Sequence, residues 1–184
     1  MTLARLLRAA LVALALANLP CCGYALVGRG VTTDPSIKRI GVPMFRDTTG
    51  KTNLDQMITR KVIEELLRRG RFDVVQQATG VDAVVDGEIV SYNATPVGFE
   101  GRGEEVSATS QTQASRYAVT VTARVKYVMQ GVTEPIWAND SFTFRDEYDV
   151  GSDASSFFDQ EGQALERLTQ AFARSLVSAM LEAF

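Results

Sequence analysis

The stretch that decides the fold is residues 37–70, IKRIGVPMFRDTTGKTNLDQMITRKVIEELLRRG, where a strand pattern leads directly into a helix pattern. Residues 37–45 are mostly apolar, and residues 46–51 contain the Asp, Thr and Gly typical of a turn. Thr52 or Asn53 can cap the helix that follows, and Gly70 can end it. Apolar residues recur in this helix at helical spacing: Leu54, Met57, Ile58, Val62, Leu66 and Leu67.

Further strands are expected after this helix. Residues 71–77 form a short strand pattern, and residues 83–94 form a longer one that Gly87 breaks. Residues 96–114 are rich in Gly, Ser, Thr and Gln without apolar periodicity, which predicts a long, mobile hairpin loop. Residues 117–127, YAVTVTARVKY, alternate apolar and polar side chains and so predict a half-buried strand.

The remainder of the chain completes the pattern. Another strand carries Phe142, Phe144, Tyr148 and Val150 on one face. A long C-terminal helix follows, with apolar residues at helical spacing: Leu165, Leu168, Phe172, Leu176 and Met180. The sequence therefore predicts one α/β domain over residues 37–184, an α+β sandwich. Both amphipathic helices cover one face of a mixed four- to five-stranded sheet, whose first two strands are parallel.

Residues 1–21 have the features of an export signal. Arg5 and Arg8 precede the wholly apolar run 9–17, which is shorter than the roughly 20 residues that a membrane-spanning helix needs. Leu19 to Cys22 then resembles the lipobox of bacterial lipoproteins, with Leu three residues before the modified Cys22. Residues 22–36 would form a lipidated lead-in. The alternative is a cleaved signal followed by an unmodified Cys21–Cys22 pair.

The composition excludes several functions. Without the signal, 17 basic and 22 acidic residues remain, a net charge near −5, which argues against a nucleic-acid partner. The chain has no His, so the usual general base and most zinc sites are missing. Enzymatic chemistry would have to rest on Asp, Glu, Ser, Lys or Tyr, and no nucleophile–base pair can be named among these residues. We therefore expect no enzymatic activity, and we also expect no metal and no cofactor.

One basic set stands out on the polar face of the strand at 117–127. Arg116, Arg124 and Lys126 are at even spacing and should project from the same side of the sheet, where they could pair with phosphates of an anionic lipid. The alternative is an ordinary solvated strand face. An acidic cluster, Asp146, Glu147 and Asp149 near Asp153, does not match the ligand spacing of a calcium loop and indicates a solvated strand edge.

Several segments resemble the LptE family of lipopolysaccharide-assembly lipoproteins. These are Cys22-Gly23-Tyr24, residues 37–45, Arg69-Gly70-Arg71-Phe72 and Asp86-Gly87-Glu88-Ile89, in the family's element order. The resemblance implies a non-enzymatic lipoprotein in the outer membrane, anchored on its periplasmic face. It also implies a role as plug and assembly partner of the β-barrel protein LptD, with binding of lipopolysaccharide.

Similar strand-helix segments occur in CsgG-like secretion lipoproteins and in activators of peptidoglycan synthases, which remain the alternative. Gly23 follows Cys22 in place of the Asp that retains many lipoproteins in the inner membrane, and it therefore favours the outer membrane.

Overall fold

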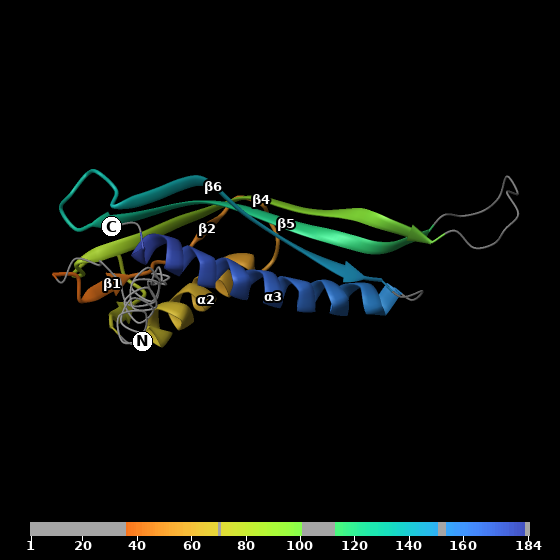
Figure 1. Cartoon of the computed structure of the whole chain (residues 1–184), viewed down its shortest axis with the longest axis horizontal. Coiled ribbons are helices and arrows are strands. Elements are labelled where there is room, and N and C mark those ends of the chain that lie inside the picture. The colour runs from red at the N-terminus through yellow and green to blue at the C-terminus, as the bar shows by residue number, and fades with distance from the viewer. Residues whose placement is uncertain (1–35, 70, 101–112, 151–153, 183–184) are drawn as a thin grey trace, which may run out of the picture. The chain divides into compact units, whose positions relative to one another are not determined.

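Strand β4 (Ala83–Glu100) lies at the centre of a six-stranded mixed sheet (Figure 1). The main order of strands is β3-β1-β4-β5-β6, and β2 also pairs with β4. β1 is parallel to both β3 and β4, β2 is parallel to β4, and β5 is antiparallel to β4 and β6. The other strands are β1 (Arg39–Gly41), β2 (Arg46–Asp47), β3 (Asp73–Val75), β5 (Gln113–Met129) and β6 (Trp137–Asp149).

The computed structural model describes residues 36–69, 71–100, 113–150 and 154–182. The predicted export signal 1–21, Cys22, and the lead-in up to residue 35 lie outside the described residues. So do Gly70, Asp153 and the middle of the predicted hairpin loop, residues 101–112.

Helices α2 (Leu54–Arg68) and α3 (Ala154–Leu181) both lie on the same face of the sheet (Figure 1). This arrangement confirms the predicted α+β sandwich. Asn53 occupies the N-cap of α2 with φ 62°, a left-handed conformation that Asn tolerates, but its side chain makes no capping hydrogen bond. None of the helices in the described ranges is long and apolar enough to cross a membrane.

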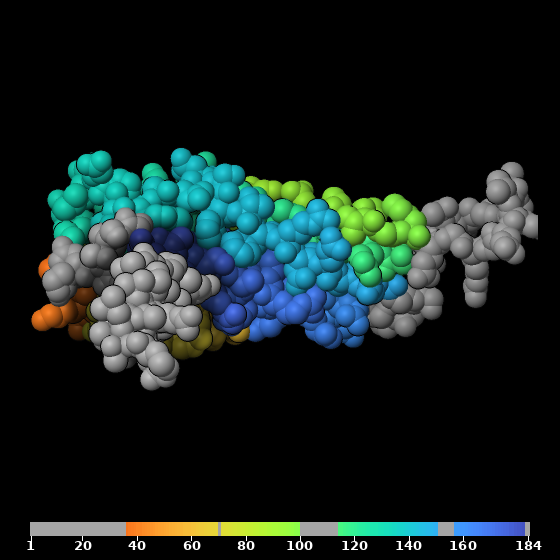
Figure 2. Space-filling model, in the orientation of Figure 1, coloured from red at the N-terminus to blue at the C-terminus, as the bar shows by residue number. Residues whose placement is uncertain are grey.

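The core lies between the sheet and the two helices. The alternation predicted for β5 is confirmed, since its odd-numbered residues from Val119 to Tyr127 are fully buried. Phe172 of α3 contacts the rings of Phe142 and Phe144 on β6, at 5.1 and 5.6 Å between centroids. Figure 2 shows β6 and α3 side by side along the face turned to the viewer.

The strand predicted at 37–45 is interrupted. β1 ends at Gly41, and the chain pairs with β4 again only at Arg46, which adds the short strand β2 to the expected sheet. Pro43 lies in the gap, and a proline has no N–H to donate to a neighbouring strand. The interruption turns Phe45 into the core, where its N–H donates to the Oγ1 of Thr59 at 3.0 Å.

The expectation that Gly87 breaks its strand is wrong. β4 continues through Gly87, and the glycine is needed because the ring of Phe45 packs directly on it. A Cβ at this position would lie 2.5 Å from the Cζ of Phe45, closer than real Cβ contacts allow. The missing side chain is thus a packing requirement of the core.

One irregularity of β4 lies three residues further along, and two more register shifts follow between Pro96 and Phe99. Ile89 pairs with Ala123 and Ser91 pairs with Thr122, so Val90 is an extra residue that forms a β-bulge. The bulge reverses the alternation of β4: Ile89 faces the helices before it, and Tyr92 faces them after it, opposite Val121. Tyr92 accordingly donates a hydrogen bond from its hydroxyl to Glu161 of α3.

The predicted hairpin loop at 96–114 is wrong at both ends. Residues 96–100 belong to β4 and residues 113–114 to β5, and they pair with each other. Residues 93–97 are exposed, so this part of the hairpin lacks the one-sided burial that produces apolar alternation. Its backbone pairing therefore left no pattern in the side chains.

Replacing Gly87 with Ala should destabilise the fold by about 1–3 kcal/mol, because the added methyl collides with Phe45. Thermal and denaturant unfolding measure the change. Gly162→Ala is the matched control, since a Cβ on this helical glycine meets nothing within 4 Å and should stabilise α3. Adding Phe45→Leu to Gly87→Ala should recover part of the loss, and strict additivity of the two changes would contradict the packing explanation.

A second prediction concerns Asp82, whose carboxylate accepts the backbone N–H groups of Lys38 and Arg39 at 2.8 Å each. These hydrogen bonds lower the pKa of Asp82 below its ordinary 3.8. Since the folded state has the lower pKa, Asp82 contributes stability above about pH 4 and loses it as the pH falls further. Asp82→Asn should therefore flatten the acid limb of the stability curve between pH 5 and 3. An unchanged acid limb would show that this contact contributes nothing.

Candidate functional site

The face of the sheet that points away from α2 and α3, here called the outer face, carries polar side chains along all three long strands. Strand register brings residues of β4, β5 and β6 together in rows that cross the sheet. From one end to the other, the β4 and β5 pairs are Asp86 with Lys126, Glu88 with Arg124, Ser91 with Thr122, Asn93 with Thr120, Thr95 with Ala118, and Gly98 with Arg116. The outer face is thus polar, as the alternation predicted for residues 117–127 indicates.

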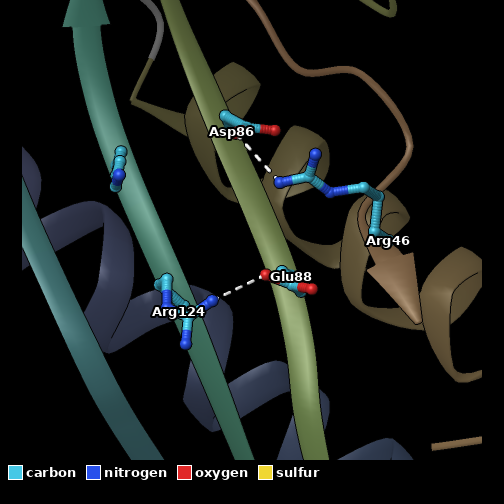
Figure 3. Close-up of a pocket in the computed structure, with 5 residues that line it drawn as sticks. Arg46, Asp86, Glu88 and Arg124 are labelled. Carbon is cyan, nitrogen blue, oxygen red and sulfur yellow. Dashed lines mark hydrogen bonds and ion pairs between the residues drawn. The ribbon is translucent and has the colours of Figure 1, made fainter. Parts of the chain in front are cut away.

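Charged residues gather at the end of the outer face where β2 joins β4. Arg124 pairs with Glu88 at 2.9 Å and lies 3.5 Å from Asp140, and Arg46 pairs with Asp86 at 3.4 Å. Figure 3 shows Arg124 directed toward Glu88 and Arg46 toward Asp86. With Lys126, these side chains line a shallow hollow of about 120 Å³. We call Arg46, Asp86, Glu88, Arg124 and Lys126 the proximal cluster.

Lys126 differs from the other two cations of the proximal cluster. Its register partner is Asp86, but Asp86 pairs with Arg46, and Lys126 forms no ion pair among the described residues. The ammonium therefore remains available to an external anion. Arg124 is 46% exposed, and an exposed pair of this kind contributes little stability, about 0–1 kcal/mol. Its guanidinium can exchange Glu88 for a ligand at small cost.

The predicted basic set is not a single site. Arg124 and Lys126 lie together, but Arg116 precedes Arg124 by eight residues, which is about 26 Å along a strand. Arg116 pairs with Asp149 at 2.7 Å, and this hydrogen bond raises the pKa of Arg116. It lines a second hollow of the outer face, together with Val97, Phe99 and Arg145.

The acidic residues of β6 are engaged in ion pairs. Asp146 pairs with Arg167 of α3 at 2.9 Å, Glu147 with Arg145 at 2.9 Å, and Asp149 with Arg116. The described part of the chain contains no group of three His, Cys, Asp or Glu placed to hold a metal ion. The cluster acts structurally, by joining β6 to α3 and β5.

Sequence reasoning missed Arg46, because it assigned residues 46–51 to a turn. β2 instead places Arg46 beside β4, opposite Glu88. The signal that was available is the pair Asp86 and Glu88, two carboxylates at alternate positions of a predicted strand. Such a pair on a polar face favours cations on the neighbouring strands, and a basic residue just after a β pattern is a candidate.

A polar cluster also lies on the inner side of the sheet. Glu161 of α3 accepts the hydroxyl of Tyr92 and pairs with Lys51 at 2.9 Å. Burial and the hydrogen bond to Glu161 raise the pKa of Tyr92, and burial raises the pKa of Tyr148 to about 12. Both tyrosines therefore stay protonated at neutral pH. The cluster anchors α3 to β4 just beyond the bulge.

A comparison with known protein families identifies the family to which this chain belongs. The family model described as LptE, lipopolysaccharide-assembly, matches residues 37–180, which is most of the chain and nearly all of the described domain. The chain belongs to the LptE family. The sequence resemblance is therefore confirmed, and LptE membership makes the chain one of a family of envelope lipoproteins of lipopolysaccharide assembly.

Solved structures share the fold of this LptE-family chain. A protein from Xanthomonas campestris is 12% identical with a TM-score of 0.53, over 79% of this chain and 85% of the other. An uncharacterized lipoprotein B from Nitrosomonas europaea is 12% identical with a TM-score of 0.50, over 80% and 86%. A hypothetical protein from Chlamydia trachomatis is 12% identical with a TM-score of 0.50, over 79% and 99%. At this identity the likeness shows the fold alone.

No curated protein matches the chain significantly by sequence. The LptE match thus carries the assignment, and it favours this family over the CsgG-like and synthase-activating alternatives. LptE proteins form a non-enzymatic lipoprotein family, which agrees with the lack of histidine in this sequence.

Proposed function

We propose that this chain is an outer-membrane lipoprotein subunit of the lipopolysaccharide transport machine. In this role it assists the assembly of the LptD β-barrel, plugs it, and binds lipopolysaccharide with its outer face. It performs no enzymatic reaction. The match of the LptE family model over residues 37–180 is the observation that carries the proposal.

The outer face suits contact with lipopolysaccharide because it combines cations with neutral polar groups. Lys126 has no ion pair among the described residues, and Arg124 lies one row away with an exposed guanidinium. Both can donate charge-assisted hydrogen bonds to the same phosphate-bearing group. Arg116 would contact a separate part of the ligand, because it lies near the opposite end of β5.

Cys22 supplies the membrane anchor in this proposal. One acyl chain alone gives marginal membrane binding, so stable attachment requires more than one. The segment between Cys22 and the start of the fold is short, and lipidation would therefore hold the domain close to the periplasmic face of the outer membrane. Gly23 after Cys22 is consistent with export past the inner membrane.

Charge reversal tests the ligand contact. The double change Arg124→Glu and Lys126→Glu should weaken lipopolysaccharide binding roughly 10- to 100-fold, as expected for the loss of charge-assisted hydrogen bonds. Binding of the purified lipoprotein to lipopolysaccharide in detergent measures the effect. Arg174→Glu, an exposed change on α3, is the matched control and should bind as the unchanged protein does. Equal weakening by both variants would contradict a specific role of the outer face.

Affinity purification of the full chain from its native envelope tests the partner and the anchor together. The proposal expects a tight complex with a large β-barrel protein, recovered from the outer-membrane fraction. Cys22→Ser should abolish stable membrane attachment in cells that lack this barrel. Recovery of a ring-shaped pore or of a periplasmic synthase in place of the barrel would contradict the proposal, and persistent attachment of Cys22→Ser would contradict lipidation.

A further inference from the structure

The middle of the outer face carries a patch of neutral polar side chains that the proximal cluster does not include. It spans three rows of the sheet, and its members are Ser91, Asn93, Thr95, Thr120, Thr122 and Thr143. We call these six residues the hydroxyl patch. Three of them, Asn93, Thr95 and Thr143, are exposed, and the others are half-buried.

The hydroxyl patch is held in place by its own hydrogen bonds. Thr122 and Thr143 lie directly opposite each other with their Oγ1 atoms 3.0 Å apart, and Asn93 donates to the Oγ of Ser91 at 2.8 Å. The hydroxyl of Thr143 donates to the backbone carbonyl oxygen of Ser141 at 3.3 Å, so Thr122 is the donor to Thr143. Each hydroxyl can donate one hydrogen bond and accept two, so these contacts leave capacity for a ligand. Short and β-branched side chains also lose little rotamer freedom on binding. The patch is therefore preorganised.

The chemistry of these side chains points to a ligand whose groups both donate and accept hydrogen bonds. Lys and Arg can only donate, and ionised Asp and Glu can only accept, whereas hydroxyls and amides do both. Sugar hydroxyls have the same dual character. Rows of the patch extend over about 13 Å along the strands and 10 Å across them, a flat area suited to a chain of sugar rings.

The charges next to the hydroxyl patch indicate which kind of sugar chain fits. Glu88 and Arg124 form the adjoining row, and Lys126, without an ion pair among the described residues, lies in the row after that. On β6, Arg145 and Glu147 extend the rows of Thr120 and Thr95, and these two opposite charges pair with each other at 2.9 Å. A ligand that is phosphorylated at one end and neutral beyond it therefore matches the order of the rows. A second copy of this chain is a poorer occupant, because it would place the same cations against each other and like charges repel.

We propose that the hydroxyl patch binds the neutral sugar chain of a phosphorylated glycolipid whose phosphate is held by Arg124 and Lys126. The inference rests on the function proposed above and adds the saccharide part of the ligand to it. Thr122 and Thr143 accept hydrogen bonds from sugar hydroxyls at the centre of the patch, because their own hydrogens are engaged within the protein. Asn93 contributes its amide at the open edge of β4.

The experiment compares two probes on the full lipoprotein, lipopolysaccharide with its core sugars and lipid A without them. The double variant Thr122→Val and Thr143→Val removes both hydroxyls but keeps the shape and strand propensity of each side chain. Its affinity for core-bearing lipopolysaccharide should fall roughly tenfold, and its affinity for lipid A should change less than twofold. Thr133→Val, an exposed change in the turn between β5 and β6, is the matched control and should alter neither.

Two results would overturn the inference while the proposed function stands. One is unchanged binding of core-bearing lipopolysaccharide by the double variant, and the other is equal weakening for both probes. Loss of the barrel complex in this variant with intact lipopolysaccharide binding would assign the patch to the protein partner and would also overturn it. If the unchanged protein bound neither probe, lipopolysaccharide binding itself would fail, and the inference would fail with it.

Discussion

The burial of one face of the sheet by α3 is the constraint on which the rest of the structure depends. Phe172 packs on Phe142 and Phe144, and the odd-numbered residues of β5 complete the layer beneath the helix. Because side chains alternate along a strand, the burial of this face determines which residues lie on the other. Beyond the bulge at Val90, β4 still has one face toward the helices and one outer face. Tyr92 points toward Glu161 of α3, and Ser91 lies on the outer face.

The sequence predicted the parts of the fold whose side chains are buried on one side. The helices and β5 were correctly placed because their apolar residues repeat with the period of the element. The prediction was wrong at Gly87, because the glycine is required by a contact with Phe45, which lies in another segment of the chain. It was also wrong at residues 96–100, because strands that pair while exposed on both sides show no apolar alternation.

For the site, the alternation of β5 correctly placed Arg124 and Lys126 on one face. The alternation could not show the ion pair between Arg116 and Asp149, or that β2 places Arg46 beside β4. Both depend on pairing between segments that are distant in the sequence.

The outer face has the properties expected of a binding surface supported by a rigid layer. Its charged pairs are exposed and so exchange readily with a ligand, and the row of Ser91, Thr122 and Thr143 is fixed by the hydrogen bond between Thr122 and Thr143. A polar sheet face needs no partner for stability, so the domain can fold before it binds any ligand. Family membership gives this surface its context in lipopolysaccharide assembly.

Site-specific photo-crosslinking can determine whether the outer face is the face that binds the ligand. A photoreactive residue would be placed at Thr120 on the outer face and, in a separate protein, at Arg174 on the exposed side of α3. We expect crosslinks to lipopolysaccharide from position 120 and none above background from position 174. Crosslinks from position 174 alone, or equally from both positions, would contradict it.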